Sequence, residues 1–202
     1  DDTEYDLINP KNNQVVGQLR ARKVFDLIVK MAWETGDPGL WFIDKTNHSP
    51  ANPLQGLMII EATNPCGEQP LFPMDVCNLG SIALVRFVRK EGNKYSIDWD
   101  GIKRTVRLAV HFLDNVIDVN PYPLPEIMDL AHKIRRIGLG IMGWADMLVY
   151  LGIPYASDEA CKLAEEVQGF INKIGHDESE RLAEARGSFP LWNQSIYKDQ
   201  KP

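Results

Sequence analysis

The sequence predicts a mixed α/β fold that contains more helix than strand. Its 202 residues are 44% hydrophobic and 25% charged, which is close to the average composition of globular proteins. Apolar residues recur at helical spacing in several long segments, and short apolar runs bounded by glycine and proline lie between them. No repeat, low-complexity tract or linker divides the chain. We therefore expect residues 1–202 to form a single unit.

Charge and hydropathy exclude several classes of protein. Lys and Arg total 22 against 28 Asp and Glu, for a formal net charge of −6, which argues against a broad nucleic-acid-binding face. No apolar run approaches the roughly 18 residues of a transmembrane helix, and the first residues lack the pattern of a signal peptide. Three cysteines are too few for a disulfide-stapled secreted fold. These features predict a soluble cytoplasmic protein that binds neither nucleic acid nor membrane.

The first half of the chain is predicted to contain one helix and three strands. The helix covers residues 19–34, where apolar side chains recur at helical spacing, and it stops at Gly36. The strands are expected over residues 40–43, 81–88 and 94–97, and the last two are joined by a tight turn.

The second half is predicted to be helical. Its first apolar-periodic segment is a long helix that is capped by Asp98 or Asp100 and ends before the proline-rich residues 120–125. Further helices are expected over about residues 126–136, about residues 141–151, and from Ser157 to about Arg186.

The densest group of reactive side chains surrounds Cys66. Pro65 and Gly67 lie on either side of this thiol and disfavour regular helix or sheet. If the segment is extended, the side chains of Asn64, Cys66 and Glu68 point to one side at intervals of roughly 7 Å. Such a row offers a sulfur reagent, a carboxylate for proton transfer and a hydrogen-bonding amide.

The thiols also allow simpler interpretations. Cys66 and Cys77 are eleven residues apart and the histidine before them is His48, which is not the spacing of zinc ligands, so no metal site is predicted. No Cys-x-x-Cys pair supports a thioredoxin-like role. Cys161 is expected to be a packing thiol in a helix. From the residues alone, an enzyme with Cys66 as nucleophile and Glu68 as base, and a non-catalytic interaction module, both stay open.

A Gly-x-Gly-x-x-Gly pattern at residues 138–143 matches the dinucleotide-binding fingerprint. That fingerprint follows an apolar strand and opens a helix, whereas residues 133–137 are too charged for a buried strand. The glycines are therefore predicted to let a helix and its neighbours approach closely. Arg135 and Arg136 are expected to pair with carboxylates or to face solvent.

Several separated motifs resemble the catalytic subunit of ribonucleotide reductase. Residues 62–71 and 77–82 are similar to the finger-loop region of that family, placed here at about residues 61–81. Residues 24–44 and 135–146 are similar to the family segments before and after this loop. The residues of these motifs and the short spacing between the two cysteines look most like the adenosylcobalamin-dependent, class II enzymes. The resemblance covers nearly the whole chain.

The resemblance implies part of a ten-stranded α/β barrel, built as two antiparallel five-stranded halves with a central finger loop and incomplete in this chain. Residues 1–202 would be the central part of the catalytic barrel domain. The loop that grips substrate phosphate and the effector-binding loops are expected elsewhere in the reductase. We therefore expect this chain alone to be inactive.

The resemblance also implies a role for each reactive residue. Cys66 matches the thiol that becomes a thiyl radical and removes the 3′ hydrogen of a ribonucleotide. Glu68 matches the general base that takes the 3′ hydroxyl proton, and Asn64 matches the amide that hydrogen-bonds the substrate. Cys77 matches one half of the redox dithiol, whose partner is expected upstream of this chain. The implied reaction reduces ribonucleotides to 2′-deoxyribonucleotides for DNA synthesis.

The implied cofactor is adenosylcobalamin, since a radical source lies beyond the chemistry of amino-acid side chains. No residue of this chain is assigned to hold it. Nucleotide effectors are expected to bind outside this segment. The implied partners are a ribonucleoside diphosphate or triphosphate substrate, a thioredoxin-like reductant, the rest of the reductase chain and a second copy in a homo-oligomer.

Overall fold

The computed structural model describes residues 2–199 and groups the chain into two compact units, residues 1–42 and residues 43–202. Each unit is described by itself below. That residues 1–202 form a single unit, the central part of a catalytic barrel domain, stays a prediction.

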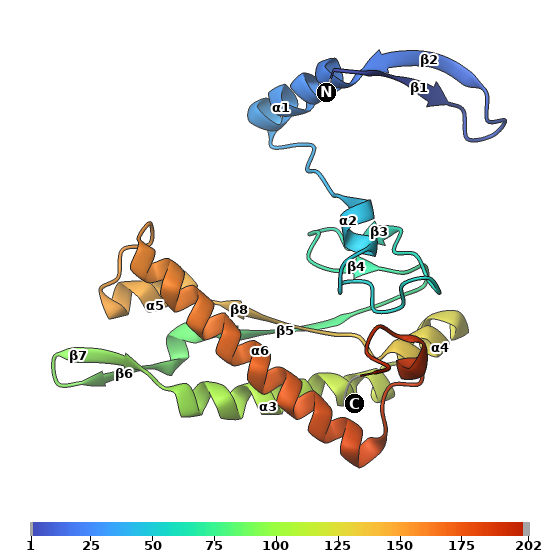
Figure 1. Cartoon of the computed structure of the whole chain (residues 1–202). Coiled ribbons are helices and arrows are strands. Elements are labelled where there is room, and N and C mark those ends of the chain that lie inside the picture. Colours follow the sequence, from blue (N-terminus) through green and yellow to red (C-terminus); the bar gives the residue numbers. More distant parts are fainter. Residues whose placement is uncertain (1, 200–202) are drawn as a thin grey trace. The chain divides into compact units, whose positions relative to one another are not determined.

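The first unit consists of a hairpin followed by a helix (Figure 1). Strands β1 (Glu4–Ile8) and β2 (Val15–Arg20) pair antiparallel, and helix α1 (Ala21–Thr35) follows directly. Gly36 ends the helix in the left-handed conformation, with φ of 87°, which glycine adopts without a steric penalty. The predicted helix is confirmed, whereas the hairpin before it was not predicted. Every residue of β1 is exposed, so this strand buries none of its side chains.

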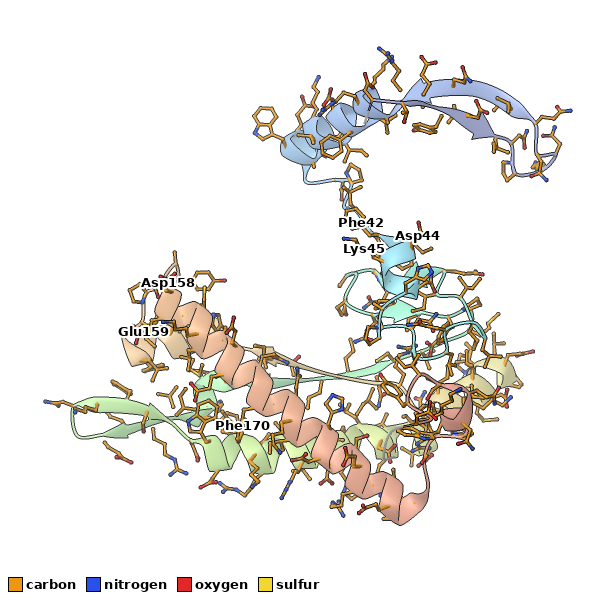
Figure 2. All side chains as sticks on the ribbon, viewed as in Figure 1. Phe42, Asp44, Lys45, Asp158, Glu159 and Phe170 are labelled. Atoms are coloured by element: carbon orange, nitrogen blue, oxygen red, sulfur yellow. The ribbon has the colours of Figure 1, made fainter. Side chains whose placement is uncertain are left out.

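The strand predicted over residues 40–43 is wrong. Residues 37–42 have no regular structure, and Ile43 instead begins a short helix, α2 (Ile43–Asn47), on which Figure 2 shows Asp44 and Lys45. Leu40 and Phe42 are 58% and 66% exposed, so this apolar run is not a core strand. A short apolar run cannot be assigned to strand or helix by its periodicity alone.

A small antiparallel pair and a parallel pair follow. Strand β3 (Ala62–Thr63) pairs with β4 (Pro70–Leu71). Strand β5 (Asn78–Ala83) pairs in parallel with β8 (Ile137–Met142), and the two lie side by side in Figure 1. Strand β8 replaces the first residues of the helix predicted over 141–151, and this part of the prediction is wrong.

The predicted hairpin is confirmed, with one interruption before it. Strand β5 gives way to a 3-10 turn, η1 (Leu84–Phe87), and not to one continuous strand over residues 81–88. Strands β6 (Val88–Glu91) and β7 (Lys94–Ile97) then pair antiparallel around a two-residue turn. Gly92 takes φ of 62° there, as such hairpin turns require.

The remaining elements are four helices and a final 3-10 turn. The helices predicted from the sequence pattern are confirmed. Helix α3 begins at Trp99 because the Asp98 carboxylate accepts a hydrogen bond from the Gly101 N–H at 2.9 Å. Helix α6 begins in the same way, because the Ser157 hydroxyl accepts from the Ala160 N–H at 3.1 Å. Their bounds are α3 (Trp99–Val119), α4 (Pro125–Ile134), α5 (Trp144–Leu151), α6 (Asp158–Arg186) and η2 (Trp192–Gln194).

The main core lies where α6 packs across α3 and where α3 contacts β5 and β8 (Figure 1). Phe170 lies near the middle of α6 (Figure 2), and its ring meets Trp99 edge-on with the centroids 5.0 Å apart. The buried residues of this core are Ile82, Leu84, Ile102, Val106, Val110, Met147, Val167, Ile171, Ile174 and Leu182. A smaller cluster of Leu54, Ile60, Phe72 and Ile134 supports the loops on either side of β3 and β4.

The mixed α/β class predicted from the sequence is confirmed. Within residues 2–199 the strands form four two-stranded sheets, and none of them closes into a barrel. Over the same residues, no helix combines the length and the apolar character that crossing a bilayer needs.

Candidate active site

Cys66 lies at the tip of the short β3–β4 hairpin. The Asn64 N–H donates to the Gln69 carbonyl at 3.1 Å, and the Gly67 N–H donates back to the Asn64 carbonyl at 3.0 Å. Gly67 takes φ of 83°, a value that favours glycine. Proline before the thiol and glycine after it are thus the residues that a tight turn requires.

This turn corrects the extended row expected from the sequence. Residues 64–67 fold back on themselves, so the side chains of Asn64, Cys66 and Glu68 do not alternate as along a strand. Cys66 and Glu68 are exposed at the tip. Asn64 is half-buried, and its Oδ1 accepts the Gln69 N–H at 3.0 Å. Its amide therefore braces the loop that carries the thiol and the carboxylate.

Cys77 lies just before β5 and is half-buried. Its thiol donates a weak hydrogen bond to the Asn78 carbonyl, with sulfur and oxygen 3.6 Å apart. Burial raises the pKa of the Cys77 thiol to about 11; the charge of Arg136 opposes this rise, and the charges of Asp75 and Glu68 add to it. Cys77 is therefore a protonated thiol near neutral pH, and the carboxylate of the Cys66 loop lies within electrostatic reach of it.

Gly138 brings the Cys66 loop and Cys77 together. In the parallel ladder Gly138 stands opposite Leu79. A Cβ atom added at Gly138 would clash with the side chain of Leu79. It would also lie 2.9 Å from Nε2 of Gln69 and 3.3 Å from Sγ of Cys77. Gly138 has no side chain, and the side chains of Gln69 and Cys77 lie close together over it. Gln69 is at the base of the Cys66 loop. The sequence predicted a close approach at these glycines, and Gly138 makes one. The predicted helix is wrong there, because Gly138 lies on strand β8.

Arg136 and Asp75 form a buried ion pair next to this position. The Nε of Arg136 donates to Oδ2 of Asp75 at 2.8 Å, and the Asp75 side chain has no exposed surface. The guanidinium carbon lies 5.3 Å from the centre of the Phe72 ring. Desolvation raises the pKa of Asp75, and Arg136 acts against that rise. The sequence predicted that Arg136 would pair with a carboxylate, but it did not indicate that the pair lies beside Cys77.

Arg135 makes a separate set of ion pairs. Its guanidinium contacts Asp114 at 2.9 Å and Asp118 at 2.7 Å, both on α3. The hydrogen bond from Arg135 lowers the pKa of Asp118. The predicted carboxylate pairing of both arginines is therefore confirmed, and the two neighbouring residues serve different parts of the fold.

Cys161 lies apart from these groups in the first turns of α6. It is exposed, so the packing role predicted for it is wrong. The buried side chains of α6 recur at helical spacing, with Ala160 followed by Val167 and Ile171, and Cys161 lies outside this buried stripe.

Comparison with known proteins agrees with these features. The family model described as "Ribonucleotide reductase, barrel domain" matches residues 2–202. A vitamin B12-dependent ribonucleoside-diphosphate reductase of Thermoplasma acidophilum is 46% identical over 201 residues, which cover 99% of this chain and 26% of that protein. An enzyme of the same name from Mycobacterium tuberculosis (strain CDC 1551 / Oshkosh) is 47% identical over 196 residues, 97% of this chain and 28% of that protein.

More distant relatives include the ribonucleoside-diphosphate reductase subunit alpha of Chlamydia pneumoniae, which is 34% identical over 88% of this chain and 17% of that subunit. The chain thus spans about a quarter of the length of the Thermoplasma acidophilum and Mycobacterium tuberculosis enzymes. Because the family model covers nearly every residue, the chain belongs to the ribonucleotide reductase barrel-domain family.

Proposed function

We propose that this chain is the central part of a reductase barrel that converts ribonucleotides into 2′-deoxyribonucleotides for DNA synthesis. One observation carries the proposal: in a chain of this family, the loop that bears Cys66 and Glu68 meets Cys77 across Gly138. A hydrogen-abstracting thiol, a proton acceptor and a reducing thiol are the groups that such a reduction needs. The complete barrel would have ten strands in two antiparallel halves, and residues 61–81 would form its central finger loop.

The proposed chemistry assigns one role to each group. Cys66, as a thiyl radical, takes the 3′ hydrogen atom of the ribose and becomes a thiol. Glu68 accepts the proton of the 3′ hydroxyl, and the 2′ hydroxyl leaves as water after protonation. Cys77 and a partner thiol outside this chain together supply two electrons and two protons and become a disulfide. One proton leaves with the 2′ hydroxyl as water, the other ends on the 2′ carbon, and Glu68 returns its proton to the 3′ oxygen. Return of the hydrogen atom from Cys66 to the 3′ carbon completes the 2′-deoxyribonucleotide and regenerates the radical.

Two features of the hairpin support these roles. Cys66 and Glu68 are exposed at a loop tip, where a substrate can reach both side chains. Asn64 uses Oδ1 to brace the loop, so we assign the substrate hydrogen bond to its Nδ2 donors. The same residue then positions the thiol and contacts the nucleotide.

Adenosylcobalamin is the cofactor we propose, because the relatives with 46% and 47% identity are named vitamin B12-dependent. When bound, it supplies the radical chemistry that amino-acid side chains lack. The exposed thiol of Cys66 fits a radical source held by other parts of the reductase. The names of these relatives also favour a ribonucleoside diphosphate as substrate. A thioredoxin-like reductant, effector sites outside this segment and a homo-oligomer complete the proposal.

The test is a Cys66→Ser substitution in the complete reductase that carries this sequence, assayed with adenosylcobalamin, a ribonucleoside diphosphate and a dithiol. We expect no deoxyribonucleotide, because a hydroxyl cannot replace the thiol as a reversible hydrogen carrier. Cys161→Ser is the matched control, since it removes an exposed thiol from a helix away from the site, and it should retain activity. Deoxyribonucleotide formation by folded Cys66→Ser protein would refute the proposal.

A further inference from the structure

Arg136 and Cys77 enter the parallel sheet at the same end. The ladder between β5 and β8 begins with Asn78 opposite Ile137 and continues without a bulge. Cys77 and Arg136 are the residues immediately before these partners. Because parallel strands in register keep equivalent residues side by side, the cation is placed beside the thiol by the sheet itself.

The guanidinium of Arg136 is fixed by two other contacts. Asp75 accepts the hydrogen bond from Nε at 2.8 Å, and the guanidinium carbon lies over the Phe72 ring. The Nη2 atom is buried, and none of the described residues accepts a hydrogen bond from it. A buried donor without an acceptor is costly, so this N–H is available to an acceptor that forms during the chemistry.

The charged groups around Cys77 act in opposite directions. Burial and the carboxylates of Asp75 and Glu68 favour the neutral thiol, whereas Arg136 favours the thiolate. Thiol–disulfide exchange proceeds through thiolates. When a disulfide of half-buried Cys77 is reduced, its sulfur leaves as a thiolate. A cation beside Cys77 is therefore needed to stabilise that negative charge.

We propose that Arg136 is a positioning residue that stabilises the thiolate of Cys77 when the disulfide of Cys77 is reduced, and that Asp75 holds Arg136 in place. A thiolate of the dithiol reductant attacks the partner sulfur, the S–S bond breaks, and the electron pair leaves on Cys77. The second reductant thiol then resolves the mixed disulfide, so the reductant is oxidised to a disulfide and two thiols are restored. The role of Arg136 in turnover rests on the proposed function. Its effect on the thiolate fraction of Cys77 does not.

The experiment measures the rate at which iodoacetamide alkylates Cys77 in the reduced, nucleotide-free full chain, at a fixed pH below the thiol pKa. Mass spectrometry of the peptide that contains Cys77 separates this thiol from all others. Arg136→Gln should slow alkylation at least about threefold, since the rate follows the thiolate fraction and one pKa unit changes it about tenfold. Asp75→Asn keeps an acceptor for Nε but removes the negative charge, so it should speed alkylation.

These opposite signs distinguish electrostatics from packing, because a loosened site would expose the thiol and speed alkylation in both variants. Arg135→Gln is the matched control: it removes a neighbouring arginine whose partners, Asp114 and Asp118, lie on α3, and the rate should not change. Circular dichroism checks that each variant is folded. An Arg136→Gln rate equal to or above the unsubstituted rate overturns the proposal, and so does a slower rate in Asp75→Asn. The alkylation rates do not test the proposed function. That proposal would be refuted only by deoxyribonucleotide formation in the Cys66→Ser assay.

Discussion

Alanine at Gly138 tests the contact that joins the two halves of the site. A Cβ at this position would clash with Leu79 and would lie 2.9 Å from Gln69 and 3.3 Å from Cys77. At Gly140, two residues further along β8, the nearest atom would be Oγ of Ser81 at 3.7 Å, an ordinary contact. Neither glycine has a positive φ, so the alanine backbone fits at both positions.

The magnitude follows from the atoms that must move. All three neighbours of the new Cβ at Gly138 are side-chain atoms that can rotate, so the cost should lie in the lower part of the overpacking range, about 1–2 kcal/mol. Both substitutions also restrict the unfolded chain, which stabilises the protein by about 0.4–1 kcal/mol. This effect cancels when the two variants are compared. Gly138→Ala should therefore be less stable than Gly140→Ala by about 1–2 kcal/mol.

Urea unfolding followed by far-ultraviolet circular dichroism measures this difference. With a denaturant slope of about 2 kcal/mol per molar, the midpoint of Gly138→Ala should lie about 0.5–1 M below that of Gly140→Ala. If neither variant had a lower midpoint than the unsubstituted protein, Leu79 and Gln69 would not press on this position. A matching loss in Gly140→Ala would show that β8 rejects any side chain here, and it would refute the contact argument.

Two further predictions concern a helix start and the pH dependence of stability. Ser157→Ala removes the hydroxyl that caps Ala160 and should cost about 1 kcal/mol in urea unfolding, whereas Ser179→Ala, exposed in the same helix, should cost nothing. The folded protein keeps the Cys77 proton up to about pH 11, while an ordinary thiol has a pKa of 9.0, so this contribution to stability is present below pH 9 and is lost as pH rises toward 11. Cys77→Ser should flatten that alkaline loss of stability; a profile identical to that of Cys161→Ser would contradict the prediction.

Local signals explain why the helices could be predicted. The Asp98 and Ser157 caps and the left-handed Gly36 act within a few residues of the chain, so the sequence pattern near each helix end is sufficient. Strand β8 could not be found in this way. Its alternating glycines read as poor strand formers, and its pairing depends on β5, far away along the chain.

The same reasoning separates the predictable and unpredictable parts of the site. Cys66, Glu68 and Cys77 stand out by residue type and by motif. Their arrangement does not, because the turn at Cys66 is set by backbone hydrogen bonds from Asn64 to the Gln69 carbonyl and from Gly67 to the Asn64 carbonyl. The ion pair of Arg136 beside Cys77 depends on the register of a parallel ladder, which no local pattern specifies.

That ladder also bears on the order in which the protein folds. Its first partners, Asn78 and Ile137, are 59 positions apart in the sequence, and closing so long a loop costs entropy before any strand contact is gained. Asn78 also donates from Nδ2 to the Leu113 carbonyl in α3 at 2.7 Å, so the helix can hold the first strand while the second arrives. We expect α3 and the β6–β7 hairpin to form early and the parallel pair to form late. The cation beside Cys77 would then be put in place by one of the last steps of folding.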